Sequence, residues 1–139
     1  MDINFVRLSA VFLIIISYLR PIITVESKRC FQPNPGLSNG CSIPFGIELK
    51  FKINFTPACQ RHDICYTCAS KFAKSREYCD SLFLKDMQKV CNMIEVAKRE
   101  ECNNYANTYH TGVQVGGERS FMKTAKCQCN QKWVPSCFP

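Results

Sequence analysis

Residues 59–68 read Cys-Gln-Arg-His-Asp-Ile-Cys-Tyr-Thr-Cys, and they hold the chain's only adjacent His-Asp pair, His62-Asp63. Just upstream, Thr56 can cap a helix N-terminus, and Pro57 suits a first helical turn. No further Pro or Gly interrupts the next fifty residues. We therefore predict a helix that starts at Thr56-Pro57 and carries the whole stretch.

On this helix Cys59, His62 and Cys65 share one side. Disulfides to a second element would fix that side, and with it the direction of the His62 side chain. Asp63 lies about 100° further round the helix and should face a loop packed alongside. The two neighbours thus have separate roles, and we interpret the stretch as an active site.

The cysteine content predicts a disulfide framework. With 139 residues the chain has room for one domain, whose modest core would be marginal without covalent support. Its eleven cysteines all lie at or after Cys30, a density typical of secreted disulfide-rich proteins. A zinc site would need paired short spacings, and only Cys65-x-x-Cys68 has that form.

The N-terminal segment predicts secretion. An apolar run over residues 8–19 is broken by Arg20, which fits a signal peptide at residues 1–27. The alternative, a membrane anchor, would need about 20 uninterrupted apolar residues. Lys28-Arg29 is a second possible cleavage site, and the sequence leaves open which one is used.

The net positive charge favours an acidic binding partner. The chain carries +7, and residues 30–139 keep 14 basic and nine acidic residues, a net +5. No Lys/Arg cluster is interleaved with aromatic residues, so nucleic acid is disfavoured. An anionic membrane surface is the favoured partner.

Residues 30–56 are rich in turn formers and predict a long ordered loop pinned by Cys41. Asn54-Phe55-Thr56 is an N-glycosylation sequon, and its use competes with the role of Thr56 as a helix cap. Both uses stay open.

Two further helices are predicted. The first covers residues 77–96, where apolar residues recur at spacings of three and four. On it, Asp80 shares a face with Met87 and Cys91, and a buried carboxylate needs a partner; the alternative is an exposed Asp favoured by the helix dipole. The second covers residues 102–116, after a charged connector at 97–101, and ends at Gly116-Gly117.

If Cys65 bridges Cys79, the first two helices are stapled antiparallel and His62 faces Asp80. A carboxylate that holds the Nδ1 proton of an imidazole leaves the other nitrogen as a base for water. No nucleophile elbow is present, so direct attack by water is the simpler mechanism. Asp63 with loop carbonyls would suit calcium, which could stabilise an oxyanion.

Residues 55–66 contain Cys59-x-x-His62-Asp63-x-Cys65-Tyr66, which resembles the signature of secreted phospholipases A2. Residues 79–91 and 102–113 extend the match to compact bacterial and fungal enzymes of this family, and residues 38–46 resemble the conodipine-type venom enzymes. The resemblance spans about residues 38–117. It implies a small all-α, disulfide-rich fold in which two antiparallel helices are stapled by a disulfide. The catalytic domain would cover residues 28–117, and a cysteine-rich tail would follow at 118–139.

The resemblance also implies roles. His62 is the base that activates water, Asp80 orients it, Asp63 is the calcium carboxylate, and Tyr66 supports the site. The reaction that the resemblance implies is hydrolysis of the sn-2 ester of a glycerophospholipid.

Carbonyls at Asn39 and Gly40 correspond to the family's calcium loop. Asn39 stands where the microbial enzymes carry an acidic residue, which lowers the charge of the site. Ala58 stands where the animal digestive and snake-venom enzymes carry a cysteine, so the chain does not resemble that branch.

The family implies the bridges Cys41–Cys59, Cys65–Cys79 and Cys91–Cys102. Five cysteines remain, so either one thiol is free or an intermolecular disulfide forms. They are Cys30, Cys68, Cys127, Cys129 and Cys137. Lys98-Arg99 is either a cleavage site that gives two disulfide-linked chains or an ordinary charged loop.

Interface binding should precede catalysis, and a set of apolar residues with one lysine are candidates for membrane contact. They are Phe45, Ile47, Leu49, Phe51, and Trp133 with Lys132. The rival function is a non-catalytic toxin or binding module on the same scaffold. A purely structural secreted protein would leave a paired, inward His and Asp without a purpose.

Overall fold

The computed structural model describes residue 30, residues 37–42 and residues 49–139. Within these ranges, three α-helices carry the fold and no strand is present: α2 (Lys52–Cys68), α3 (Arg76–Met93) and α4 (Arg99–Gly116). The predicted all-α class is therefore confirmed. The expected signal peptide at 1–27 and the candidate contact residues Phe45 and Ile47 lie outside the described residues. No helix in the described part of the chain has both the length and the apolar character to cross a membrane.

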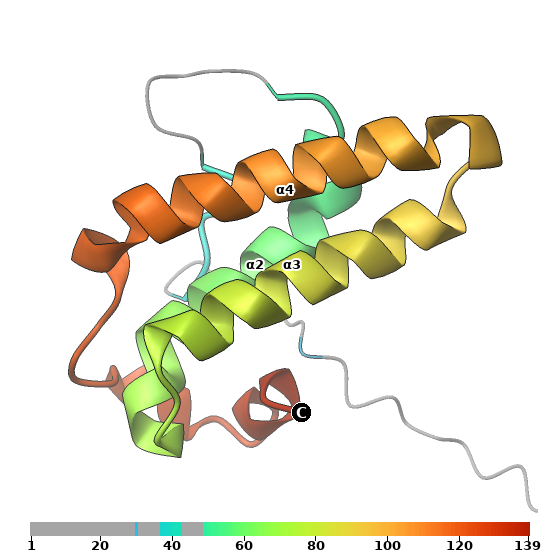
Figure 1. The fold of residues 1–139 in the computed structure, drawn as a ribbon. Coiled ribbons are helices and arrows are strands. Elements are labelled where there is room, and N and C mark those ends of the chain that lie inside the picture. Colours follow the sequence, from blue (N-terminus) through green and yellow to red (C-terminus); the bar gives the residue numbers. More distant parts are fainter. Residues whose placement is uncertain (1–29, 31–36, 43–48) are drawn as a thin grey trace, which may run out of the picture.

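The helices α3 and α4 form an antiparallel hairpin. They lie side by side along most of their length (Figure 1). The short 3-10 helix η3 (Val96–Lys98) turns the chain between them, and the disulfide Cys91–Cys102 joins them beside this turn. The hairpin supplies two walls of the core.

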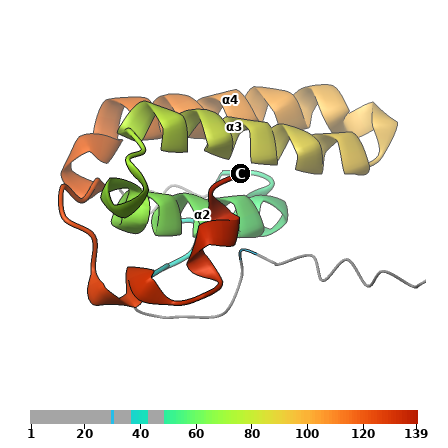
Figure 2. The same ribbon diagram turned by 90° about the horizontal axis from the view of Figure 1, so that it is seen from below.

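The helix α2 forms a second layer beneath the hairpin (Figure 2). It runs antiparallel to α3, and Cys65–Cys79 staples the two helices, as predicted. The main core fills the space between the layers with side chains from all three helices. They are Phe55 and Ala58 of α2, Phe83 and Met87 of α3, and Ala106 and Tyr109 of α4.

The predicted start of α2 is wrong. The helix begins at Lys52, so Pro57 lies inside it, and the Thr56 hydroxyl donates to the carbonyl of Lys52 instead of capping the end. Phe51 precedes the helix at φ 62°, a left-handed conformation that costs a non-glycine residue about 1 kcal/mol. Its ring packs against those of Phe55 and Tyr105, with centroids 6.0 and 5.8 Å away. Core packing of these aromatics outweighs the local capping signal.

Both ends of α3 and the start of α4 differ from the prediction by one to three residues. The side chain of Ser75 accepts a hydrogen bond from the backbone N–H of Tyr78 and caps α3, which ends at Met93. The helix α4 starts at Arg99, so most of the expected charged connector is helical. It ends at Gly116, as the glycine pair predicted.

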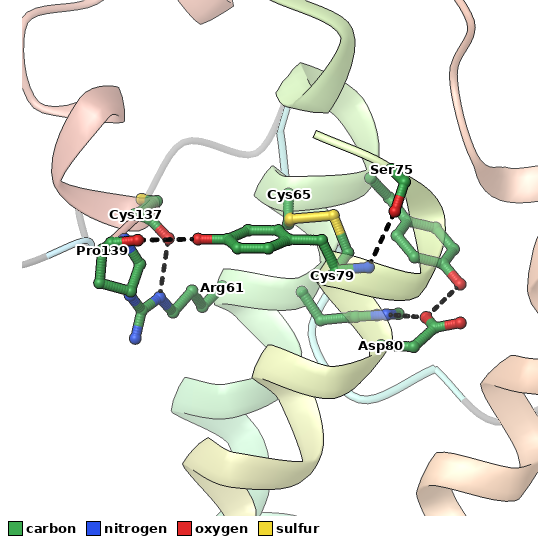
Figure 3. Close-up of a disulfide and its surroundings, with 10 residues drawn as sticks. Arg61, Cys65, Ser75, Cys79, Asp80, Cys137 and Pro139 are labelled. Carbon is green, nitrogen blue, oxygen red and sulfur yellow. Dashed lines mark hydrogen bonds and ion pairs between the residues drawn. A yellow bond between two sulfur atoms is a disulfide. The ribbon is translucent and has the colours of Figure 1, made fainter. Parts of the chain in front are cut away.

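Two disulfides hold the C-terminal tail: Cys68–Cys129 joins it to the end of α2, and Cys30–Cys137 joins it to the segment that precedes α2. Cys68–Cys129 and Cys30–Cys137 leave Cys127 as an exposed free thiol. The tail contains the short 3-10 helices η4 (Gly117–Ser120), η5 (Cys127–Asn130) and η6 (Val134–Cys137), and it packs beneath α2 (Figure 2). Arg61 Nε donates to the carbonyl of Cys137, and the Tyr78 hydroxyl donates to that of Pro139 (Figure 3). The tail is thus fixed to both stapled helices.

Candidate active site

The stapled helices bring His62 and Asp80 together. His62 on α2 lies one turn from Cys65, and Asp80 on α3 follows Cys79 directly. His62 Nε2 lies 2.9 Å from Asp80 Oδ1, and both residues are buried, with 7% and 3% of their surface exposed. Asp80 lies beside the Cys65–Cys79 disulfide (Figure 3). The predicted His-Asp contact is therefore present in the structure.

The ring nitrogen that meets the carboxylate is not the predicted one. We expected Nδ1 to face Asp80, whereas Nε2 does so. Nε2 is the nitrogen farther from the backbone, so it can reach a carboxylate on a neighbouring helix. The ring plane is held by Tyr66 and Phe83, whose centroids lie 4.1 and 4.6 Å from that of His62. Nδ1 is the ring nitrogen that does not face Asp80.

Asp80 contacts three polar side chains: His62, Tyr66 and Arg76. Its Oδ1 also accepts a hydrogen bond of 2.6 Å from the Tyr66 hydroxyl, and its Oδ2 lies 3.8 Å from Arg76 Nη1. Burial pushes the pKa of Asp80 up, but the hydrogen bonds from His62 and Tyr66 outweigh it and leave the pKa below its ordinary value. Burial and the bond to Asp80 raise the pKa of the Tyr66 hydroxyl well above its ordinary value. Asp80 is therefore an ionised acceptor and Tyr66 a neutral donor.

Asp63 faces the loop on the other side of α2, as expected from its position. Its Oδ2 accepts hydrogen bonds from the Ser38 hydroxyl and the backbone N–H of Asn39, each 3.0 Å long. The disulfide Cys41–Cys59 fixes this loop to α2, and Gly40 takes φ 77°, where glycine is favoured. Burial raises the pKa of Asp63 above its ordinary value despite these donors.

The side chain of Asn39 tests whether this loop fits calcium. Its inward terminal atom lies 3.1 Å from Asp63 Oδ2, 3.2 Å from Ser42 Oγ and 3.3 Å from the carbonyl of Gly40. With nitrogen inward, the amide donates to these oxygens. These oxygens of Asp63, Ser42 and Gly40 are the kind of ligand that calcium prefers, and one of them belongs to a carboxylate.

No group of three or more His, Cys, Asp or Glu side chains that could hold a metal occurs among the described residues. A cation at this loop would therefore depend on Asp63 together with neutral oxygens. A single carboxylate predicts a weak site.

A cleft of about 460 Å³ opens onto His62 and onto the loop that faces Asp63. His62 and Asp63 line it on one side, and Leu49, Phe83 and Tyr109 supply apolar wall. Lys126 of the tail also lines it. A cleft with apolar walls and a few convergent polar groups is the usual form of a small-ligand site.

Sequence reasoning missed three residues around the site. Ser38 was only one turn former among many. Arg76 was not singled out, although its Nη1 donates to the carbonyls of Val113 and Gln114 as well as facing Asp80. Gly117 was predicted only as a helix end, yet it lies against the Tyr66 hydroxyl. The Arg76–Asp80 contact is an i,i+4 pair on α3, so its spacing could have indicated it. The contacts of Ser38 and Gly117, and those of Arg76 with α4, join segments far apart in the sequence and leave no local signal.

Fold and site together define a small disulfide-stapled helical protein with a buried His-Asp pair at the wall of a cleft. Residues 27–117 match the family model described as prokaryotic phospholipase A2. The chain belongs to this family.

Named relatives agree with the family. Conodipine-P3 of Conus purpurascens is 42% identical over 73 residues, which are 52% of this chain and 38% of that protein. The conodipine-M alpha chain of Conus magus is 41% identical over 54 residues, 39% of this chain and 69% of that one. The human group XIIA secretory phospholipase A2 is 37% identical over 68 residues, 47% of this chain and 33% of that protein. The chain thus spans well under half the length of conodipine-P3 and of the human enzyme. No solved structure matches the chain.

Proposed function

We propose that this chain is a secreted, calcium-dependent phospholipase A2 that hydrolyses the sn-2 ester of glycerophospholipids to a fatty acid and a lysophospholipid. The observation that supports this most is the 2.9 Å contact between His62 Nε2 and Asp80 Oδ1 at the wall of the cleft. Membership of the phospholipase A2 family and the names of the relatives support the same reaction.

The proposed chemistry uses His62 as base and then as acid. Asp80 accepts a hydrogen bond from the Nε2–H group, which stays on the ring, so Nδ1 is free to take a proton from a water molecule. The oxygen of that water attacks the ester carbonyl. When the carbon–oxygen bond to the glycerol breaks, His62 gives its proton to the leaving alkoxide, and the fatty acid is released. Asp80 stays ionised throughout and stabilises the imidazolium that forms between the two steps.

Calcium is part of the proposal. Asp63, Asn39 and Gly40 are the residues that would hold it, and Ser42 offers a further oxygen. Bound there, calcium would supply positive charge for the anionic groups of the substrate and the developing oxyanion. The neutral Asn39 lowers the charge of the site, so we expect a calcium affinity in the weak range of extracellular modules.

Secretion and membrane contact belong to the same proposal. Five disulfides suit an oxidising compartment. Leu49 lines the cleft and stays a candidate for lipid contact. Phe51 packs on Phe55 and Tyr105 and belongs to the core instead. Trp133 is half-buried, with its Nε1 donating to Gln131, beside an exposed Lys132.

The test measures fatty-acid release from mixed phospholipid vesicles, with calcium and with chelator. Wild type should release fatty acid only with calcium, and His62→Gln should lose about 100- to 10,000-fold of the rate. His110→Gln is the matched control, because His110 is the chain's other histidine and lies on α4, not in the cleft lining. It should keep the wild-type rate.

One observation favours a second function. Asn39 in the calcium loop would suit a scaffold that has become a non-catalytic toxin or binding module. No fatty-acid release from a correctly disulfide-bonded sample would overturn the enzyme and leave this module. Fatty-acid release that is equal with calcium and with chelator would support the His62–Asp80 mechanism but contradict a role for calcium.

A further inference from the structure

We propose that Gly117 is a positioning residue for the His62–Asp80 pair and acts through Tyr66. Its effect on turnover rests on the proposed function. The observation is a close approach between distant segments: the backbone of Gly117, directly after α4, lies against the Tyr66 hydroxyl on α2.

The backbone of Gly117 does not itself require glycine. Its φ and ψ are −77° and −15°, in the right-handed region open to any residue. A Cβ at this position, however, would overlap the hydroxyl oxygen of Tyr66 and lie 3.2 Å from Cε2 and Cζ of its ring. Glycine is therefore needed for the space it leaves.

The neighbouring glycines differ. At Gly116 an added Cβ meets nothing within 4 Å, and the same holds at Gly112. The backbone of Gly116 is also right-handed, with φ −106° and ψ −9°. A methyl group one residue earlier is thus accommodated, so the restriction is specific to position 117.

The hydroxyl that Gly117 contacts is part of the buried polar contacts of the dyad. Tyr66 donates to Asp80 Oδ1, the same oxygen that meets His62 Nε2. The Tyr66 ring also lies 4.1 Å from the imidazole, centroid to centroid. Displacement of Tyr66 by a side chain at 117 would disturb both partners of His62.

Residues 117–122 complete a socket around Tyr66. The Phe121 ring meets the Tyr66 ring edge-on at 5.4 Å, and the Met122 N–H donates to the Tyr66 carbonyl at 3.1 Å. The Phe121 N–H in turn donates to the carbonyl of Gly117. This segment begins where the region matched by the family model ends. The start of the tail is therefore a support of the site.

The experiment is a double-mutant cycle on vesicle hydrolysis with Gly117→Ala and Tyr66→Phe. We expect Gly117→Ala to lower kcat by up to about 100-fold, with KM little changed, because a small misplacement of the pair affects the chemical step. Tyr66→Phe should lower kcat too. In the Tyr66→Phe background, Gly117→Ala should cause no further loss, because removal of the hydroxyl leaves only the tight ring contacts. Additive losses, or a wild-type kcat for Gly117→Ala, would overturn the proposal.

Two further measurements, of unfolding and of NMR signals, do not depend on hydrolytic activity. The free energy of unfolding should fall for Gly117→Ala in the wild-type background, fall less in the Tyr66→Phe background, and hold for the control Gly116→Ala. The NMR signals of the His62 ring nitrogens should move in Gly117→Ala and stay in Gly116→Ala. If Gly117→Ala fails to fold, recovery of folding in the double variant with Tyr66→Phe would support the contact between Gly117 and the Tyr66 hydroxyl. A double variant that also fails to fold would overturn the proposal. Wild type that releases no fatty acid would defeat the proposed function alone, since these two readouts still decide the role of Gly117.

Discussion

Asp80 carries two hydrogen bonds and one nearby guanidinium, and its lowered pKa links stability to pH. A carboxyl with a folded pKa below the unfolded value stabilises the fold above the unfolded pKa, and this stabilisation is lost as pH falls through the folded pKa. The groups that face it are His62 and Tyr66 from α2 and Arg76 from its own helix.

We therefore expect Asp80→Asn to lower the free energy of unfolding at neutral pH by about 1–3 kcal/mol. The gap to wild type should persist down to about pH 4, the ordinary range of an aspartate, and shrink below it. Urea unfolding of both proteins at pH 7, 5 and 3, with disulfides intact, measures this. A gap as large at pH 3 as at pH 7 would mean that Asp80 is not ionised in the folded protein.

At this scale the sequence predicted the pairing but not its details. His62 and Asp80 each lie close to a cysteine of one disulfide, so their meeting follows once Cys65 is bonded to Cys79. Which ring nitrogen meets Asp80 depends on the side-chain torsions of His62, which the neighbouring rings of Tyr66 and Phe83 decide. Such packing of distant side chains leaves no mark in the spacing of residues.

Between elements, Arg76 ties the start of α3 to the end of α4. Arg76 Nη1 donates to the carbonyls of Val113 and Gln114 in the last turn of α4, and the Val113 carbonyl also accepts from the Gly117 N–H. We expect Arg76→Met to lower the free energy of unfolding, because its hydrogen bonds to α4 are exchanged for bonds to water. Amide exchange at Gly116 and Gly117 should become faster.

Arg119→Met is the matched control, since Arg119 is an exposed arginine in η4. It should stay within about 0.5 kcal/mol of wild type. Equal effects of the two substitutions would show that Arg76 contributes charge alone and does not hold the end of α4.

Periodicity predicted α3 and α4, whereas α2 was predicted from Thr56-Pro57 and the absence of later Pro and Gly. The glycine pair at the end of α4 acts locally, so that end was predictable. The start of α2 was not, because Phe51 and Phe55 pack into a core built partly from α4. A capping signal describes only the nearest turn, and tertiary burial can outweigh it.

For the whole molecule, a cut at Lys98-Arg99 should leave one covalent unit. Three disulfides join residues before the cut to residues after it: Cys91–Cys102, Cys68–Cys129 and Cys30–Cys137. The Lys98 side chain is exposed, at the junction of η3 and α4. Trypsin cleavage there, read by mass spectrometry, should give one species without reductant and two fragments with it.

The control is Lys98→Gln, in which a cut between residues 98 and 99 should disappear. Release of a fragment from the nicked wild type without reductant would contradict the bonding of the tail. These tail pairings could not be predicted, because cysteine spacing does not encode connectivity. The structure resolves the odd number by leaving Cys127 exposed and unpaired.

His62 lies on a segment whose two flanking cysteines are bonded to different places, Cys59 to the loop that faces Asp63 and Cys65 to α3. In a reduced chain nothing covalent aims either side chain. If the proposed function holds, a newly made chain is therefore inactive until its disulfides have formed. A copy in the reducing cytosol would lose both restraints, so we expect its hydrolytic activity there to be low.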